Sequence, residues 1–356
     1  MQDIDCTLCK SKAQIQHSNF TGYQVDMKFK IYLCDNCNTS FPLPRIDSSK
    51  IYDFIYKNGA NVPGYNRYWE YFKNIKNKYN PLSFLANSEE AYWGIRESLN
   101  EIVLDKKSSK ILEIGCGLGY LTYALRSEKY NVQGLDISKE AIENARNIFG
   151  DYFICMDLFE FVETKIETFD LVILTEVIEH VERPIEFISA ILKILKNKGK
   201  IIMTTPNRSL APYDIIWDTE APPVHHWWFS EDSMKYIANK LSLDFGFINF
   251  ERYYKKHPLE YKVNKLRKNV LRTPIINENW HLYSYNIPKK KGRIKLFFKN
   301  ILSRFKFLKG FYLKFKAFIF PSLVLCGERG QILCVIFEKK NPLISNTIEK
   351  NIANIR

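Results

Sequence analysis

One short stretch of the chain, Glu176-Val-Ile-Glu-His, holds two carboxylates and an imidazole. If this stretch is helical, spacings of i, i+3 and i+4 place Glu176, Glu179 and His180 on one face. Such a group can remove the proton of a hydroxyl as a general base, or it can hold a divalent metal that activates the hydroxyl. A purely structural role is the third alternative.

Four cysteines near the N-terminus form two CxxC pairs, Cys6 with Cys9 and Cys34 with Cys37, separated by 24 residues. Each CxxC turn directs two thiolates at one point, and two such turns complete a tetrahedral sulfur site for zinc. Alternating apolar residues between the pairs indicate short strands, so the pattern predicts a zinc ribbon. Because four thiolates leave no open coordination position, we expect the zinc to be structural. Redox-active or coincidental cysteines are the alternative.

A glycine-rich turn, Glu113-Ile-Gly-Cys-Gly-Leu-Gly-Tyr120, follows the first strand predicted after Lys110. Its glycines, Gly115, Gly117 and Gly119, let the backbone turn sharply and approach a ligand without intervening side chains. A dinucleotide fingerprint needs its third glycine three residues after the second, and that position is Tyr120 here. The spacing therefore argues against a nicotinamide or flavin cofactor.

Two further carboxylates stand at the ends of the next predicted strands. Asp136 comes 17 residues after Gly119 and can accept hydrogen bonds from both hydroxyls of a ribose. Asp157 ends the third strand, where it can accept from an adenine amino group. With Glu113, these residues favour an adenosyl ligand that lacks phosphates, because the glycine loop has no lysine. A fold that uses them only for turns and caps is the alternative.

The elements that position these side chains alternate between strand and helix. We predict strands at 111–114, 131–135, 152–155, 169–174, 200–204 and 330–339, and helices at 120–128, 139–148, 184–195 and 231–240. This alternation is typical of a parallel, doubly wound sheet with helices on both faces, where ligands bind beyond the carboxyl ends of the strands. The predicted fold class is α/β, with a Rossmann-like, mostly parallel, seven-stranded sheet.

Three segments carry a resemblance to a known family, Glu113–Gly119, Gly134–Ser138 and Phe169–Val181. Together they resemble the class I S-adenosylmethionine-dependent methyltransferases. The resemblance implies that Glu113 and the three glycines hold the methionine part of S-adenosylmethionine. It also implies that Asp136 holds the ribose and that Asp157, with Met156, frames the adenine.

The Glu-x-x-Glu-His order is similar to that of small-RNA terminal 2′-O-methyltransferases and of ubiquinone-pathway O-methyltransferases. In those families these side chains hold a divalent metal, so the resemblance implies a second metal site at Glu176, Glu179 and His180. A further ligand would come from the loop after the fifth strand, where His225 and His226 stand. We expect both histidines to form part of the substrate wall, with or without metal. A metal-free acid–base or positioning role stays open beside the metal.

The composition predicts a globular protein of several domains. At 356 residues, with 46% hydrophobic and 26% charged residues, the chain is long enough for two or three domains and is not disordered. We expect a zinc ribbon at 1–44, a helical bridge at 45–105 and a methyltransferase domain at 106–252 and 327–342. A basic amphipathic insertion occupies 253–326. The tyrosines and tryptophans of the bridge predict packing, with a roof over a ligand pocket as the alternative.

The net charge of +13 is concentrated in the insertion, where residues 281–326 hold eleven Lys and Arg and no acid. Within 289–316, lysines lie opposite an apolar stripe rich in phenylalanine, a pattern typical of a helix on an anionic membrane surface. Packing against the domain and polyanion binding are the alternatives, and segregated aromatics make nucleic acid the less favoured partner. A polar N-terminus and no long apolar run predict a cytoplasmic, peripheral protein at the inner membrane face.

These observations predict an enzyme that transfers a methyl group from S-adenosylmethionine to an oxygen of a small polar or sugar-containing acceptor. A CxxC module ahead of such a domain resembles bacterial methyltransferases acting on sugars, which suggests cell-surface glycan biosynthesis. The alternatives are an RNA methyltransferase, a quinone or phenol O-methyltransferase, and a non-catalytic zinc-ribbon binding protein.

Overall fold

The structure is a computed structural model that describes residues 4–62, 64–164, 168–210, 220–257, 259–260, 274–283, 324–325 and 328–340. Most of the predicted basic insertion, including its amphipathic stripe at 289–316, lies outside the described residues, so membrane-surface binding stays a prediction. Among the helices that the structure describes, none combines the length and apolarity needed to cross a lipid bilayer.

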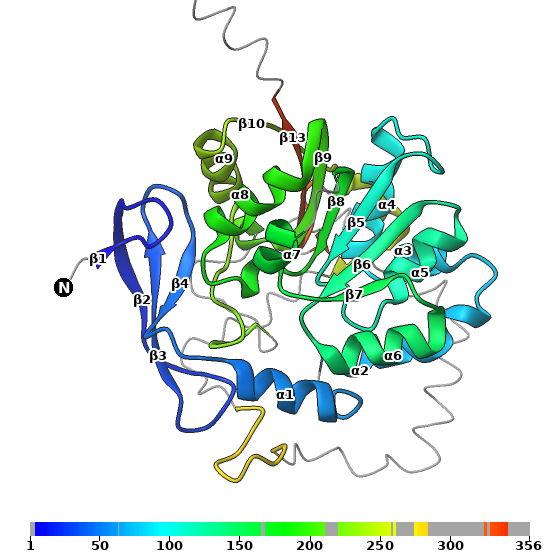
Figure 1. Cartoon of the computed structure of the whole chain (residues 1–356). Helices are drawn as coiled ribbons and strands as arrows, with labels where there is room; N and C mark the ends of the chain where they lie inside the picture. The colour runs from blue at the N-terminus through cyan, green and yellow to red at the C-terminus, as the bar shows by residue number, and fades with distance from the viewer. Residues whose placement is uncertain are drawn as a thin grey trace, which may run out of the picture.

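A seven-stranded sheet forms the centre of the larger body, with strand order β10-β13-β9-β8-β5-β6-β7 (Figure 1). The strands are β5 (Lys110–Ile114), β6 (Asn131–Asp136), β7 (Phe153–Cys155), β8 (Phe169–Thr175), β9 (Leu195–Pro206), β10 (Leu243–Phe247) and β13 (Ile332–Lys339). Strands β5 to β9 pair in parallel, whereas β13 is antiparallel to both β9 and β10. The predicted doubly wound, mostly parallel, seven-stranded sheet is confirmed.

Helices cover both faces of this sheet. One hydrophobic cluster joins it to α7 (Leu158–Thr164), α8 (Pro184–Ile194) and α9 (Glu231–Lys240). A second cluster joins the other face to α3 (Pro81–Ser88), α4 (Glu90–Glu101), α5 (Tyr120–Ser127), α6 (Lys139–Phe149) and α10 (Glu251–Lys256). Helix α8 shows why the sequence folds this way. Pro184 begins it, and the buried residues Phe187, Ile188, Ile191 and Ile194 recur every three or four positions.

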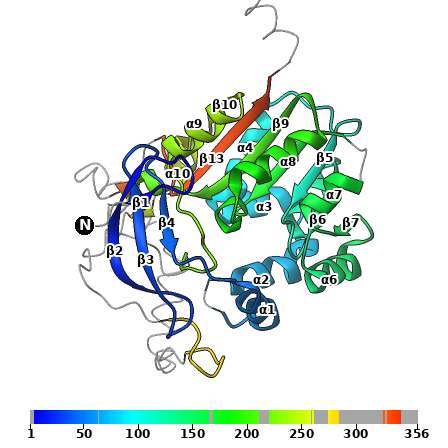
Figure 2. The same ribbon diagram turned by 60° about the vertical axis from the view of Figure 1, so that its left-hand side comes forward.

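The N-terminal segment forms a separate antiparallel sheet of β1 (Ile4–Asp5), β2 (Lys12–Thr21), β3 (Lys28–Cys34) and β4 (Ser40–Leu43). Figure 2 shows this sheet lying beside α9 and the neighbouring part of the large body. Its buried residues Cys34 and Phe41 belong to the same hydrophobic cluster as Trp227 and Met234. The module and the large domain therefore share one core.

Residues between the module and the large sheet are helical, as the sequence predicts. Helices α1 (Ser49–Asn58) and α2 (Asn66–Asn74), with the short turn η1 (Ile75–Asn77), precede α3 and α4. A two-stranded pairing of β11 (Leu259–Glu260) with β12 (Val324–Leu325) lies within the predicted insertion.

Candidate active site

A cavity of roughly 1180 Å³ lies beyond the carboxyl ends of β5, β6 and β8. The loops that follow these strands supply its floor, through Gly117, Asp136 and Glu176 among others. Side chains from α1 and from the start of α2 form the roof, opposite this floor. The cavity therefore stands where ligands bind in doubly wound sheets.

The glycine loop exposes its backbone to this cavity. Gly117 has φ +50°, and a Cβ atom placed there would meet nothing within 4 Å, so the space beside it is open. Gly119 has φ +75°, and a Cβ atom there would lie 2.5 Å from the Phe153 ring. Both positions therefore require glycine, one for its left-handed backbone beside a ligand space and the other also for close packing.

Two predicted cofactor-binding carboxylates line the cavity next to this loop. The Asp136 carboxylate accepts hydrogen bonds from the backbone N–H of Gly117 at 2.7 Å and of Ser138 at 2.8 Å. Burial raises the pKa of Asp136, and these backbone donors oppose that shift. Glu113 accepts a hydrogen bond from the Thr122 hydroxyl, and burial raises the pKa of Glu113 to about 8. Both acids therefore line the cavity, and their contact with a cofactor stays a prediction.

Met156 and Asp157 lie beside the cavity without being among the described residues that line it. The Met156 N–H donates to the Asp136 carbonyl at 3.1 Å, so the two strand ends are adjacent. The Asp157 carboxylate accepts from the Phe159 N–H at 2.7 Å, at the start of α7. A contact of Met156 and Asp157 with adenine stays a prediction.

Glu179, His180 and His225 converge in the cavity wall. One potential ligand atom from each lies within 4.8 Å of the others. The His180 and His225 rings meet edge to face, with centroids 4.5 Å apart. His180 Nδ1 lies 2.8 Å from the Val224 carbonyl, so it carries the proton and donates it. The Nε2 lone pair of His180 is thereby left available.

The charge state of this group fits a bound cation. Glu179 is 1% exposed, and its two carboxylate oxygens have no hydrogen-bond partner among the described residues. Burial raises the pKa of Glu179 strongly and the nearby Glu176 adds to the shift, whereas the neighbouring Thr205 hydroxyl opposes it. Burial lowers the pKa of His180 to about 4, so its ring is neutral near pH 7. A buried carboxylate without partners and a neutral imidazole are a donor set that a divalent metal ion would satisfy.

Of the potential metal ligands named from the sequence, Glu176 lies outside this group, whereas His225, expected as a further ligand, lies within it. The turn η2 (Ile178–His180) is a single 3-10 turn, and Glu176 precedes it with φ +53°. The expected helical face therefore does not form. Glu176 lines the cavity elsewhere and accepts a hydrogen bond from the Tyr68 hydroxyl at 3.1 Å.

His226 is close to the group but is not among the described residues that line the cavity. Its N–H donates to the Glu179 carbonyl at 2.8 Å, and its carbonyl accepts from Arg45 at 2.7 Å. Burial lowers the pKa of His226 to about 4, so it too is neutral near pH 7. Its contacts hold the loop that carries His225.

The roof of the cavity comes from tyrosines of the helical bridge. Tyr52 and Tyr56 extend from α1, and Tyr65 and Tyr68 come from the start of α2. The sequence favours packing for the tyrosines of the bridge, with a roof over a ligand pocket as the alternative, and in the structure these four tyrosines line the cavity. The Tyr68 and Tyr120 rings stack with centroids 6.4 Å apart, which joins the roof to the helix after the glycine loop.

The four N-terminal cysteines also converge, with sulfur atoms within 4.8 Å of one another. The Sγ atoms of Cys6 and Cys37 are 3.8 Å apart, and those of Cys9 and Cys34 are 3.4 Å apart. Tetrahedral zinc with bonds of about 2.3 Å separates its sulfur ligands by about 3.8 Å. The residues therefore fit a zinc ion.

Comparison with known proteins agrees with the fold and the glycine loop. Residues 89–244 match the family model described as a methyltransferase domain. These 156 residues are similar to a methyltransferase domain and make up less than half of the 356-residue chain. An S-adenosylmethionine-dependent methyltransferase from Archaeoglobus fulgidus has a TM-score of 0.43 and 15% identity, covering 76% of this chain and 99% of that chain. At that score the likeness adds nothing to the strand order described above.

Among curated proteins, the chain is similar to ubiquinone biosynthesis O-methyltransferases. It is 30% identical to that of Actinobacillus pleuropneumoniae over 116 residues, which are 30% of this chain and 50% of the relative. It is 36% identical to that of Photobacterium profundum over 110 residues, 29% of this chain and 46% of the relative. The chain thus spans about half the length of the curated relatives it matches.

Proposed function

We propose that the protein transfers the methyl group of S-adenosylmethionine to a hydroxyl oxygen of a small, uncharged ring acceptor of the phenol or quinol class. A divalent metal ion held by Glu179, His180 and His225 activates that hydroxyl. The observation that carries this proposal is the convergence of these three side chains in the same cavity as the glycine loop.

In this proposal the chain aligns donor and acceptor and excludes water, which is most of what an in-line methyl transfer needs. The backbone around Gly117 and the Asp136 carboxylate hold the cofactor at the floor of the cavity. The metal ion, when bound, supplies a positive charge that lowers the pKa of an acceptor hydroxyl. Glu179 and His180 hold that ion, and Tyr52 and Tyr56 cover the acceptor ring.

Two observations support a phenolic or quinol acceptor over the sugar-containing acceptor of the sequence prediction. The relatives reported above are ubiquinone biosynthesis O-methyltransferases. The tyrosine roof also offers flat apolar faces to a ring.

The charge of the cavity wall favours an acceptor without phosphate. Ten carboxylates are among its described lining residues, against the two cationic side chains Arg67 and Lys139. The carboxylates are Asp47, Asp53, Glu89, Glu90, Glu113, Asp136, Glu140, Glu176, Glu179 and Glu220. Burial raises the pKa of Glu90 and Glu113 to about 8 and that of Glu179 well above its ordinary value, so these three acids are largely neutral near pH 7. The other seven acids still outnumber the two cations, and an excess of negative charge suits a sulfonium cofactor and a divalent ion and repels nucleotide or RNA phosphates.

The test is turnover with labelled S-adenosylmethionine and three acceptors, namely a catechol, a nucleotide sugar and a short RNA. Each is assayed with Mg²⁺, with Mn²⁺ and after chelation. We expect the catechol to be methylated only with metal. Methylation of the sugar or the RNA alone would refute the acceptor class, and full activity after chelation would refute the metal.

We also propose that Cys6, Cys9, Cys34 and Cys37 hold a structural zinc ion. The sulfur separations support this, as does the small size of the four-stranded module, which has little core of its own. Zinc content near one ion per chain, retained after removal of loosely bound metal, is the expected result. Absence of zinc from a folded protein would contradict it.

A further inference from the structure

The loop that carries His225 is fixed from two sides. On the inner side, the N–H groups of His226 and Trp227 both donate to the Glu179 carbonyl, at 2.8 and 3.2 Å. On the outer side, Arg45 donates to the His226 carbonyl at 2.7 Å, and its guanidinium lies 4.4 Å from the Trp227 ring centre. Arg45 lies two residues after the end of β4, so the outer contacts come from the segment that directly follows the N-terminal module.

The last strand of the module pairs directly with this loop. The Ser40 N–H donates to the Trp228 carbonyl at 3.0 Å, and the Trp228 N–H donates back to the Ser40 carbonyl at 2.9 Å. The Ser40 hydroxyl also accepts from Arg208 Nε at 3.2 Å. Apart from the pairing of Trp228 with Ser40, residues 221–230 form no helix or strand. The conformation of this loop therefore depends largely on these contacts.

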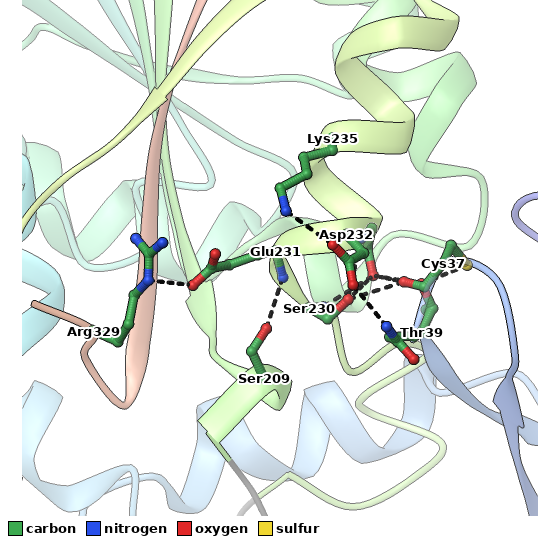
Figure 3. Close-up of polar contacts among 10 residues, drawn as sticks. Cys37, Thr39, Ser209, Ser230, Glu231, Asp232, Lys235 and Arg329 are labelled. Atoms are coloured by element: carbon green, nitrogen blue, oxygen red, sulfur yellow. Dashed lines mark hydrogen bonds and ion pairs between the residues drawn. The ribbon is translucent and has the colours of Figure 1, made fainter.

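The cysteine turn holds the far end of the loop, where α9 begins. The Cys37 carbonyl accepts hydrogen bonds from the hydroxyls of Ser230 at 2.9 Å and of Ser233 at 3.0 Å (Figure 3). Asn38 donates to the Asp232 carboxylate at 2.7 Å. Ser230 and Ser233 also form the capping box of α9. The stretch that follows His225 is therefore held at Trp228 and at Ser230 by residues of the module.

We infer that the N-terminal four-cysteine module is a positioning element of the reaction centre, and that Arg45 is the residue through which it fixes His225. Arg45 is not among the described residues that line the cavity, so it acts through the His226 carbonyl. Metal and catalytic side chains need placement within about 0.5 Å, which an irregular loop attains only when neighbouring groups restrain it.

The test compares three variants of the full-length protein with the wild type. Arg45→Met removes the donor to the His226 carbonyl while keeping the length of the side chain. Arg45→Lys keeps a positive donor. Lys12→Met is the matched control, because Lys12 belongs to the same module but makes an ion pair with Asp5 in which both side chains are more than 60% exposed.

The first measurement is the nuclear Overhauser effect between the ring protons of His180 and His225, assigned with His→Gln variants. Their 4.5 Å centroid separation predicts a clear signal in the wild type. We expect Arg45→Met to lose most of it, Arg45→Lys to restore part, and Lys12→Met to leave it unchanged.

The second measurement is the dissociation constant for Mn²⁺, at constant zinc content. Residues that orient metal ligands typically change metal affinity by about 10- to 100-fold, so we expect Arg45→Met to weaken Mn²⁺ binding about 10-fold. The affinity for S-adenosylmethionine, whose site Arg45 does not line, stays within about twofold of the wild type. Only this second measurement rests on the proposed function.

The inference would be overturned if Arg45→Met showed the His180–His225 nuclear Overhauser effect at the same intensity as the wild type. A wild-type protein that binds no Mn²⁺ would refute the proposed metal site, and the ring signal alone would then decide the inference. If Arg45→Met does not fold, Arg45→Gln, which keeps a donor but shortens the reach, takes its place in the same comparison.

Discussion

Replacing Glu179 by methionine should change stability in opposite directions with and without metal. The wild-type carboxylate is 1% exposed and its oxygens have no partner among the described residues. A buried polar group without a hydrogen bond costs about 1–3 kcal/mol. Methionine has a similar length and no such cost. The metal-free variant should therefore be about 1–3 kcal/mol more stable than the metal-free wild type.

The pH dependence of this difference has a definite sign. The folded-state pKa of Glu179 lies well above its ordinary value of 4.5, so the folded state keeps a proton that the unfolded state loses. The Glu179 contribution to wild-type stability is therefore undiminished below about pH 4.5 and falls as the pH rises above that value. The advantage of Glu179→Met should grow from about pH 5 to pH 8.

Metal should reverse the order of the two proteins. An ion present at 1,000 times its dissociation constant stabilises the folded wild type by about 4.1 kcal/mol, which exceeds the advantage of about 1–3 kcal/mol of the metal-free variant. Glu179→Met lacks one of the three ligands and gains less from the ion. Denaturant unfolding at pH 5 and pH 8, with and without Mn²⁺, measures all four free energies. The reasoning is wrong if the variant is less stable than the wild type by the same amount in every condition.

Three further changes test the floor of the cavity and the cysteine module. Gly119→Ala should lower the free energy of unfolding by at least about 1–2 kcal/mol, because φ is +75° there and the added Cβ would meet Phe153. An unchanged urea midpoint of unfolding would contradict this. Asp136→Asn should weaken S-adenosylmethionine binding by about 10- to 100-fold in calorimetry, since a hydrogen bond to a charged group contributes about 1.5–3 kcal/mol. Equal affinities would remove Asp136 from the cofactor site. Cys34→Ser should lose zinc and lower the melting temperature, and a variant that keeps one zinc per chain would refute the four-sulfur site.

Much of the large domain could be predicted from the sequence because its signals are local. Strand β8, for example, contains the apolar run 171–174. The conformation of the glycine loop follows from three glycines at alternate positions, all with positive φ. The carboxyl ends of parallel strands meet at one edge, so the position of Asp136 near the cavity follows from the strand assignment alone.

Other features of the fold and of the candidate site depend on tertiary contacts and could not be predicted from the sequence. Strand β10 lies at the edge of the sheet, where three of its five residues are exposed. Its apolar residues alternate, but the run is only five residues long and contains Asp244 and Gly246, residue types that are depleted in strands. The placement of Glu176 depended on a left-handed backbone angle that its residue type does not indicate. The sequence names His225 as a candidate, but its distance from Glu179 depends on an irregular loop whose contacts with Glu179 and with Ser40 are tertiary.

The tyrosine roof has a consequence for how acceptor choice varies among similar proteins. The matched methyltransferase region covers residues 89–244, whereas Tyr52, Tyr56 and Tyr65 precede it in the chain. Two proteins can thus share the part of the cavity that would hold the methyl donor and differ entirely in the part that would contact the methyl acceptor. Exchanging the segment before residue 70 between such proteins offers a direct route to redirecting methylation without touching the donor side.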